Sequence, residues 1–313
     1  MINAEQARAA ARSIADATLG GPAGPMDRLA SRSHYVFVSS TLVVKIIDAG
    51  DHARLGREIA LAVALPSGLA APVLASGRHV TEAGEVRYAC VARLPGNSPG
   101  MGLAGVDCRT AGRWAREAVQ QLRRLHDWVP ESPAATVLRE RLDHGGFVGR
   151  RRLLDEIERV RHLDDGTVVP RPILDGLAEI AERAPEHADT SVPVHADCHW
   201  DNWLVHDGRV TALLDFEWAR FGEPADDWMF LARFSGPHMP AVLSVISDAT
   251  ATPLETLRAA CEVREASHVT ADLRLALEQS DAHARAAAGS LVRELEELVL
   301  GRSWWRPGRP ALN

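Results

Sequence analysis

The sequence predicts an α+β fold with two lobes, in which a small strand-rich lobe precedes a larger helical one. Short apolar runs rich in β-branched residues dominate residues 1–94, whereas apolar residues at spacings of three and four dominate the remainder. The change comes at Pro95-Gly96, because these two residues stop the last strand-like run of the first part. We therefore expect an N-terminal lobe over residues 1–94 and a C-terminal lobe over residues 95–313.

The N-terminal lobe is expected to contain several strands and two helices. Residues 1–20 have helical character and end in the breaker-rich GGPAGP, and residues 53–65 place their apolar side chains on one helical face. The stretch PSGLAAPVLASG is expected to be a loop, because Gly, Pro and Ser punctuate it. The expected strands are MDRLA, YVFVS, TLVVKII and RYACVARL.

The C-terminal lobe is expected to be helical, with a few short strands near its middle. Residues 110–128 carry Ala, Trp and Leu at spacings of three and four, which is typical of an amphipathic helix. Charged but periodic segments over residues 138–161, 172–184 and 254–300 are also expected to be helices. The expected strands are SVPVH, WLVH and VTALLDF.

The composition is that of a globular protein in a reducing compartment. Of the 313 residues, 46% are hydrophobic and 25% are charged, and no apolar run approaches the ~20 residues of a membrane span. The four cysteines are widely spaced and the first residues contain no apolar signal core, so we expect a cytoplasmic protein. The net charge of −7 argues against nucleic acid as a partner. We expect a small-molecule partner, and neither nucleic acid nor a membrane.

One lysine stands alone among the basic residues. Of 35 Lys and Arg residues, 34 are Arg and only Lys45 is Lys. It lies in TLVVKIID, a strand-like run in which an unpaired buried charge would be unfavourable. An ammonium that snorkels to water from an edge strand would also explain the residue. A compact charge that must reach a phosphate inside a cleft is the functional alternative, because Arg does not replace Lys there.

The segment VHADCHWDNWLVHDGRVTALLDFEWARFGEPADD indicates phosphoryl transfer. Within it, His195, Asp197 and Asn202 have the His-x-Asp-x4-Asn spacing of kinase catalytic loops, and Asp215 follows as part of an Asp-Phe pair. Phosphoryl transfer needs one carboxylate to orient the attacking hydroxyl and accept its proton. It also needs amide and carboxylate oxygens to hold metal ions near the phosphates. A helix-capping Asp is the structural alternative for Asp197.

Four segments resemble one known family, the aminoglycoside phosphotransferase and choline kinase-like superfamily of small-molecule kinases. HADCHWDN is similar to its catalytic loop, which usually begins His-Gly-Asp, and LLDFEWARFGEPADDW is similar to its Asp-Phe metal segment with the Gly-Asp-Pro-x-x-Asp element that follows. QLRRLHDW resembles the Leu-His helix end of the family, and VVKI together with Arg57-Glu58 resembles its Lys and Glu pair. The resemblance extends over residues 31–227 and is poor beyond them.

The resemblance implies a bilobal protein-kinase-like fold and a Mg²⁺-dependent enzyme that uses ATP or GTP. It assigns Asp197 as the general base and Asn202 and Asp215 as ligands of Mg²⁺. It also assigns Lys45 to the α- and β-phosphates, with Glu58 holding the lysine. A solvated helical Glu is the structural alternative for Glu58. The residues expected to cover the phosphates are Ser31, Ser33 and His34. The residues whose backbone is expected to bond the nucleotide base are Cys90, Ala92 and Leu94.

The chain departs from the family pattern at three points. Ala196 occupies the place of the usual Gly, which restricts the backbone if its φ is positive. Glu223 stands where the family usually has Asp before Pro. No Gly-rich loop covers the phosphates, which is usual for antibiotic kinases of this type and unusual for protein kinases. The absence of a Gly-rich loop favours a small-molecule acceptor.

Structural roles are expected for two residues near the catalytic loop. We expect His195 to bond the backbone near the metal segment and to fix the loop, without acid–base chemistry. We expect Asp227 to anchor the catalytic loop by charge-assisted hydrogen bonds, while a plain helix N-cap is the alternative. Both residues would then position Asp197 without touching the substrate.

The acceptor site is the least defined part of the sequence. Trp200 could stack on a sugar or base of the acceptor, whereas core packing is expected for Trp203, Trp218 and Trp228. Glu262 and Glu265 could recruit ammonium groups of the acceptor. Arg residues are interleaved with these acids, so a solvated helix surface is the preferred interpretation of that segment.

Together these patterns predict transfer of the γ-phosphate of ATP or GTP to a hydroxyl of a small molecule. The preferred acceptor is a sugar-containing antibiotic, either an aminoglycoside or a nucleoside antibiotic, which the reaction would inactivate and so give resistance. A metabolic kinase for choline, an amino alcohol or a sugar is the alternative within the enzyme class. A nucleotide-binding pseudokinase would lack one of four residues that are all present here: Lys45, Asp197, Asn202 and Asp215.

Overall fold

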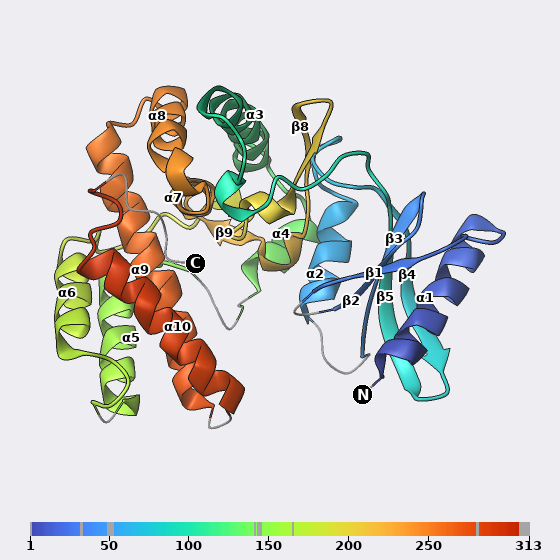
Figure 1. Cartoon of the computed structure of the whole chain (residues 1–313), viewed down its shortest axis with the longest axis horizontal. Coiled ribbons are helices and arrows are strands. Elements are labelled where there is room, and N and C mark those ends of the chain that lie inside the picture. The colour runs from blue at the N-terminus through green and yellow to red at the C-terminus, as the bar shows by residue number, and fades with distance from the viewer. Residues whose placement is uncertain are drawn as a thin grey trace. The chain divides into compact units, whose positions relative to one another are not determined.

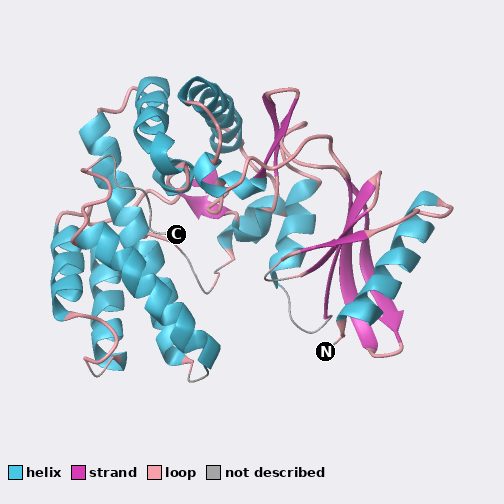
Figure 2. Ribbon diagram, viewed as in Figure 1, coloured by secondary structure: helices cyan, strands magenta, loops and turns pink. Residues whose placement is uncertain are grey.

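The computed structural model of the protein is an α+β fold, with an antiparallel sheet in the N-terminal part and mostly helices after it (Figures 1 and 2). The predicted fold class is therefore confirmed. The structure describes residues 2–31, 34–48, 53–140, 142, 146–164, 166–279 and 282–306.

Contacts within the chain divide it into two units. The first, which we call the strand unit, comprises Met1–Pro99, Trp128–Leu138 and Asp201–Ala219. The second, which we call the helical unit, comprises Gly100–Asp127, Arg139–Trp200 and Arg220–Asn313. Two segments from late in the chain thus belong to the strand unit, although they lie beyond residue 94 of the sequence.

A five-stranded antiparallel sheet forms the centre of the strand unit, with the strand order β1-β2-β3-β5-β4. Its middle strand is rich in Val and Ile, which favour the extended backbone. Because neighbouring residues of a strand point to opposite faces, Val44 and Ile46 face one side and Lys45 the other. The strands are β1 (Asp27–Leu29), β2 (Tyr35–Val38), β3 (Leu42–Asp48), β4 (Val73–Thr81) and β5 (Gly84–Ala92).

Each face of the sheet is covered by one helix (Figure 1). Helix α1 (Ala4–Leu19) packs its alanines and Ile14 into a hydrophobic core that also contains Val44 and Ile46. Its first turn is fixed by Asn3, whose side chain accepts bonds from the N–H groups of residues 5 and 6. Helix α2 (Ala53–Ala62) packs Leu55 on the other face, which is the face of Lys45.

The late segments add a hairpin to the strand unit. Strands β7 (Trp203–His206) and β8 (Arg209–Leu213) pair antiparallel, and the 3₁₀ turn η3 (Phe216–Trp218) follows. The predicted strand WLVH is therefore present, whereas β8 covers only the first four residues of the predicted VTALLDF, whose last residues lead into η3. Short helical segments precede the hairpin: α4 (Ala134–Arg139) and η2 (Trp200–Asn202).

The helical unit is built around α9, which contacts helices α5, α6, α7, α8 and α10. A two-stranded ribbon of β6 (Val192–Val194) and β9 (Arg220–Gly222) lies beside α3 and α7. Two 3₁₀ turns also belong to it, η1 (Met101–Leu103) and η4 (Gly236–His238). Its helices are α3 (Cys108–His126), α5 (Arg150–Leu163), α6 (Arg171–Glu182), α7 (Pro224–Arg233), α8 (Met239–Thr250), α9 (Leu254–Glu278) and α10 (Ala282–Val299).

One predicted loop is wrong. The second half of PSGLAAPVLASG belongs to β4, whose side chains alternate between partly buried and exposed along its length. Its Gly, Ser and charged residues weaken the apolar signal, because β4 lies at the edge of the sheet and packs on one face only. Among the described residues, no helix combines the length and the apolar character that crossing a membrane requires.

Candidate active site

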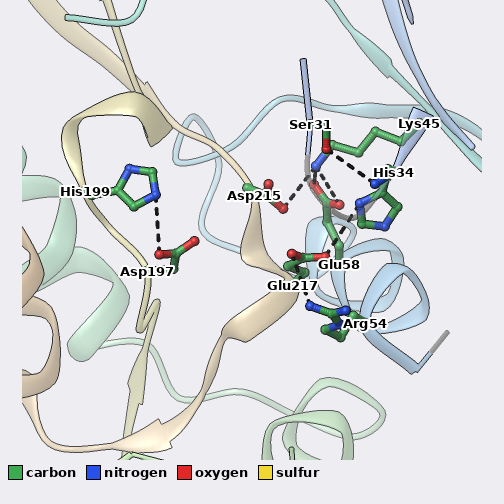
Figure 3. A network of polar contacts seen from close by, with 9 residues as sticks. All are labelled: Ser31, His34, Lys45, Arg54, Glu58, Asp197, His199, Asp215 and Glu217. Carbon is green, nitrogen blue, oxygen red and sulfur yellow. Dashed lines mark hydrogen bonds and ion pairs between the residues drawn. The ribbon is translucent and has the colours of Figure 1, made fainter. Parts of the chain in front are cut away.

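Lys45 lies at the middle of β3, between Val36 of β2 and Ala89 of β5. Its Nζ donates to both oxygens of Glu58 on α2, at 2.7 and 2.9 Å, and to Oδ1 of Asp215 at 3.2 Å (Figure 3). The Lys45 and Glu58 side chains are each only 13% exposed. The edge-strand and solvated-helix alternatives for these two residues are therefore wrong.

The two carboxylates keep Lys45 charged. Burial disfavours the ammonium, but the charges of Glu58 and Asp215 outweigh burial and raise the pKa of Lys45 above its ordinary value. The lysine thus remains a cation at every physiological pH. A compact cation with three donors, held by two acids on one face of a sheet, is a group that can bind phosphate oxygens.

Asp215 and Asn202 are brought together by the β7–β8 hairpin. Trp203 pairs with Leu213, and the N–H of Leu214 donates to the carbonyl of Asn202 at 2.7 Å. Asn202, just before β7, and Asp215, just after β8, therefore lie at the same end of the hairpin. Asp215 has a left-handed backbone, with φ of +67°, which Asp tolerates better than most residues. The turn directs its carboxylate to Lys45.

The oxygens of this hairpin end suit a hard cation. Mg²⁺ is usually held by one or two carboxylates together with water and substrate phosphates, not by a cage of protein ligands alone. In the described part of the chain, no group of three His, Cys, Asp or Glu residues is placed to hold a metal. Asn202 and Asp215 carry an amide and a carboxylate oxygen, and are the residues of this hairpin end that could hold Mg²⁺ together with a nucleotide.

Glu217 is a third acid near Lys45, and sequence reasoning missed it. It is 5% exposed, and its oxygens lie 3.8 Å from Nη1 of Arg54 and 3.7 Å from Nδ1 of His34 (Figure 3). Burial, followed by the charge of Asp215, raises the pKa of Glu217 to about 7. Its position two residues after Asp215 was the available signal, but a Glu in a turn is more often a surface residue.

The segment expected to cover the phosphates is partly described. The backbone N–H of His34 lies 3.4 Å from Oγ of Ser31, which closes a short turn before β2 (Figure 3). The His34 side chain is 1% exposed. Ser33 lies outside the described residues.

The three residues expected to bond the nucleotide base occupy different positions. Cys90 lies within β5, paired with both β3 and β4, and its side chain is fully buried. The N–H of Ala92 already donates to the carbonyl of Pro72 at 2.9 Å. Leu94 lies beyond the end of the strand. Of the three, the backbone of Leu94 is the one outside the sheet.

In the helical unit, the loop after β6 is held by Asp227 of α7. Oδ1 of Asp227 accepts from the N–H of Ala196 at 2.7 Å, and Oδ2 accepts from the N–H of His195 at 3.1 Å. The third partner is Nε2 of His126, at the end of α3, at 2.9 Å from Oδ2. The cap of α7 is Glu223, so the N-cap interpretation of Asp227 is wrong.

These bonds keep Asp227 ionised although it is completely buried. Burial opposes the charge, but the bonds from His126 and from the N–H of Ala196 hold the pKa of Asp227 below its ordinary value. His195 is also fully buried, and its Nδ1 accepts from the N–H of Asp197 at 3.2 Å. Ala196 has φ of +63°, so it adopts the left-handed backbone that the family usually gives to Gly.

Asp197 and His199 face each other across the loop. Oδ1 of Asp197 lies 3.4 Å from Nε2 of His199 (Figure 3). The Asp197 side chain is 25% exposed, so an acceptor hydroxyl can approach it. A carboxylate with this access can accept a proton from a bound alcohol.

The residues expected to bind the acceptor are buried. Trp200 has no exposed surface and donates from Nε1 to Oγ of Ser235 at 2.8 Å, so its expected stacking role is wrong. Core packing is confirmed for Trp203 and Trp228, whereas Trp218 is partly exposed, with the Arg54 guanidinium 4.8 Å from its ring.

Glu262 and Glu265 lie in the interior of the helical unit. They are 5% and 3% exposed, so the expected solvated helix surface is wrong. Glu265 bonds Arg233 at 2.5 Å and the indole of Trp304, and Glu262 bonds the indole of Trp305 at 2.9 Å. These carboxylates hold the C-terminal segment to α9, which a pattern of alternating charges could not indicate.

Comparisons with known proteins identify the family and the fold of the chain. A model of the phosphotransferase enzyme family matches residues 28–260. No curated protein is significantly similar in sequence. Among solved structures, the GDP complex of wild-type aminoglycoside 2'-phosphotransferase-IIIa has a TM-score of 0.73 at 16% identity, with 93% of this chain and 98% of that chain covered.

Two further structures are similar at the same level of identity. Macrolide 2'-phosphotransferase type I has a TM-score of 0.61 at 19% identity, with 93% of this chain and 98% of that chain covered. Aminoglycoside phosphotransferase APH(4)-Ia, in complex with AMP-PNP and hygromycin B, has a TM-score of 0.62 at 16% identity, with 93% and 99% covered. These likenesses are of fold. Because the family match spans most of its length, the chain belongs to the phosphotransferase enzyme family and is a kinase-like small-molecule phosphotransferase.

Proposed function

We propose that this phosphotransferase moves the γ-phosphate of ATP or GTP to a hydroxyl of a sugar-containing antibiotic, with Mg²⁺ as cofactor. The observation that carries the nucleotide part is the bonding of Lys45 to both Glu58 and Asp215. A buried cation that ends between two carboxylates is ready to exchange one of them for a phosphate oxygen. A protein that only binds a partner through exposed residues would not need a buried lysine between two carboxylates.

The proposed roles follow from the donor and acceptor atoms. Lys45 binds the α- and β-phosphates, and Asn202 and Asp215 hold Mg²⁺, which when bound neutralises charge on the phosphate oxygens. The acceptor oxygen forms a bond to the γ-phosphorus as the bond to the β–γ bridging oxygen breaks. The acceptor proton passes to the carboxylate of Asp197, and ADP or GDP leaves.

An antibiotic acceptor is supported by the proteins that share the fold. Their names describe phosphotransferases for aminoglycosides and macrolides, both of which carry sugars. Phosphorylation adds about −1.5 to −2 charges, enough to spoil the fit of a drug to an anionic or apolar target. The proposed biological result is resistance by inactivation.

A nucleotide-release screen tests the acceptor. ADP and GDP release would be measured with purified full-length enzyme, Mg²⁺ and a panel of aminoglycosides, nucleoside antibiotics, macrolides, choline, amino alcohols and free sugars. We expect turnover with at least one antibiotic, together with raised inhibitory concentrations for that drug in a sensitive host. Turnover of choline, an amino alcohol or a free sugar alone would replace the antibiotic assignment with a metabolic one.

Substitutions of Lys45 test the nucleotide site separately. Lys45→Met should raise the KM for ATP at least tenfold, because it removes the ammonium that faces Asp215. Lys45→Arg should also raise the KM for ATP, because a planar guanidinium cannot replace the compact ammonium between two carboxylates. Arg78→Met removes an exposed ion pair from the same sheet and serves as the control. Equal KM values in all three variants would exclude Lys45 from nucleotide binding.

A further inference from the structure

Arg57 is a buried arginine that joins three separate segments of the strand unit. It precedes Glu58 on α2 and is only 1% exposed. Its Nη1 donates to the carbonyl of Val137 at 2.6 Å and to the carbonyl of Ala219 at 2.9 Å. These carbonyls lie 80 and 162 residues further along the chain, so one guanidinium nitrogen ties α2 to two segments that the sequence places far from it.

Both carbonyls lie at the ends of short helical elements. Val137 is in the last turn of α4, and Ala219 is the C-cap of η3. Carbonyls at such ends lack a partner within their own element, and a cationic donor binds them more strongly than a neutral one. The bond to Ala219 therefore fixes the far end of η3, the turn that begins directly after Asp215.

A second arginine of α2 contacts the same turn. The guanidinium of Arg54 lies 4.8 Å from the ring of Trp218, and its Nη1 is 3.8 Å from an oxygen of Glu217 (Figure 3). Residues three and four apart lie on one face of a helix, so Arg54 shares a face of α2 with Arg57 and Glu58. This face thus meets η3 through two arginines and the lysine of β3 through its glutamate.

The contact between α2 and η3 sets the spacing of the two acids around Lys45. Glu58 comes from α2, and Asp215 immediately precedes η3. Both bond Nζ of Lys45, at 2.7 Å and 3.2 Å. If α2 and η3 could shift against each other, the two carboxylates would no longer be held on the same ammonium. A misplacement of about 1 Å in such a site can cost about 100-fold in function.

We propose that Arg57 is a positioning residue for nucleotide binding: it locks α2 to η3 and so sets the spacing of Glu58 and Asp215 around Lys45. This inference rests on the proposed function, in which Lys45 binds phosphates and Asp215 holds Mg²⁺. Arg57 itself acts from inside the strand unit, because its side chain is buried and its Nη1 bonds two backbone carbonyls.

Two substitutions of Arg57 and one control separate positioning from general stability. Arg57→Met keeps an unbranched apolar stem and removes both bonds. Arg57→Lys keeps a cation that can donate to these carbonyls, since a single nitrogen makes both bonds. Arg150→Met is the matched control in the helical unit. Arg150 donates from Nε and Nη2 to the carbonyl of Ala184 at 2.9 and 2.7 Å, so this variant also loses two bonds to the backbone.

The dissociation constant for ATP with Mg²⁺ would be measured by titration calorimetry on the full-length protein, which needs no acceptor. Circular dichroism would fix a temperature at which each variant is folded. We expect Arg57→Met to raise this Kd at least about tenfold, and Arg57→Lys to raise it about three- to fivefold. Arg150→Met should lower the melting temperature as Arg57→Met does, with the Kd within about twofold of wild type.

Lys45→Met, measured in parallel, separates failure of the inference from failure of the proposed function. If Lys45→Met weakens ATP binding and Arg57→Met stays within about twofold of wild type, Arg57 has no positioning role and the proposed function stands. If Arg150→Met weakens binding as much as Arg57→Met, the effect is one of stability and the inference is overturned. If Lys45→Met binds ATP as wild type does, the proposed nucleotide site fails and the inference falls with it.

The conservative variant decides the case in which Arg57→Met does not fold. A Kd of Arg57→Lys that is raised more than about twofold, with Arg150→Met near wild type, would support the inference. A Kd of Arg57→Lys within about twofold of wild type would overturn it.

Discussion

Substitution of Asp227 by Asn tests the anchor of the catalytic loop with a change of one atom. Asp227 is completely buried and accepts three bonds, from the N–H groups of His195 and Ala196 and from His126. An Asn can keep one oxygen for Ala196. Its amide group would then face the N–H of His195, which is itself a donor, and that buried N–H would lose its acceptor.

The magnitude follows from the lost bonds. Leaving a buried N–H without an acceptor costs about 1–3 kcal/mol, and losing a bond that a charge strengthens costs about 1.5–3 kcal/mol. Together these changes should lower the free energy of unfolding by about 3–5 kcal/mol, which is the range for breaking a buried charged pair. Turnover should fall as well, because the same bonds hold the backbone next to Asp197.

Urea denaturation of wild type and Asp227→Asn, followed by circular dichroism, would measure the difference. Asp207→Asn is the control, because the Asp207 side chain is 88% exposed, in the turn between β7 and β8. The control should change stability by less than about 0.5 kcal/mol. A loss below about 1 kcal/mol in Asp227→Asn, with turnover near that of wild type, would refute the anchoring role.

Three further predictions concern stability. Ala251 ends α8 in a left-handed conformation with φ of +53°, so Ala251→Gly should stabilise the protein by about 0.5–1 kcal/mol in thermal or urea unfolding, without changing kcat. Trp304 is 1% exposed, so Trp304→Ala should lower the free energy of unfolding by about 3–5 kcal/mol in urea, through the cavity and the lost bond to Glu265. Burial raises the pKa of Asp226 from 3.8 to about 6, so the folded protein holds a proton that the unfolded chain releases. The protonated Asp226 carboxyl therefore stabilises the fold fully below about pH 4, and this stabilisation is lost as the pH rises through 6. Asp226→Asn should remove the resulting decrease of the unfolding free energy between about pH 4 and pH 6, measured by urea denaturation at several pH values.

The parts of the site that were predictable are those with a local signal. Lys45 stood out because it is the single lysine in an Arg-rich sequence, and the strand around it has the apolar pattern of a buried β-strand. Asp197, Asn202 and Asp215 lie within one short segment with fixed spacing. Such signals survive in the sequence because the residues that carry them are close together in it.

The parts that were not predictable depend on partners far away in the chain. In the sequence, Glu262 alternates with arginines and resembles a surface residue. In the structure it is buried and accepts a hydrogen bond from the indole of Trp305, 43 residues later. The position of Trp200 near Asn202 suggested a ligand contact, but its indole N–H donates to the buried hydroxyl of Ser235. Asp227 could equally have been a helix cap, because nothing local separates a capping carboxylate from one that reaches another segment. Burial and non-local bonding decided each of these.

The strand unit is assembled from three separate segments of the chain, which affects when it can fold during synthesis. Asp215 follows Lys45 by 170 residues, and residues 201–219 complete the unit to which both belong. During synthesis, therefore, Lys45 cannot pair with Asp215 until more than two thirds of the chain has been made. A fragment that stops near residue 99 would contain the whole sheet and the Lys45–Glu58 pair, and would lack the second carboxylate, that of Asp215.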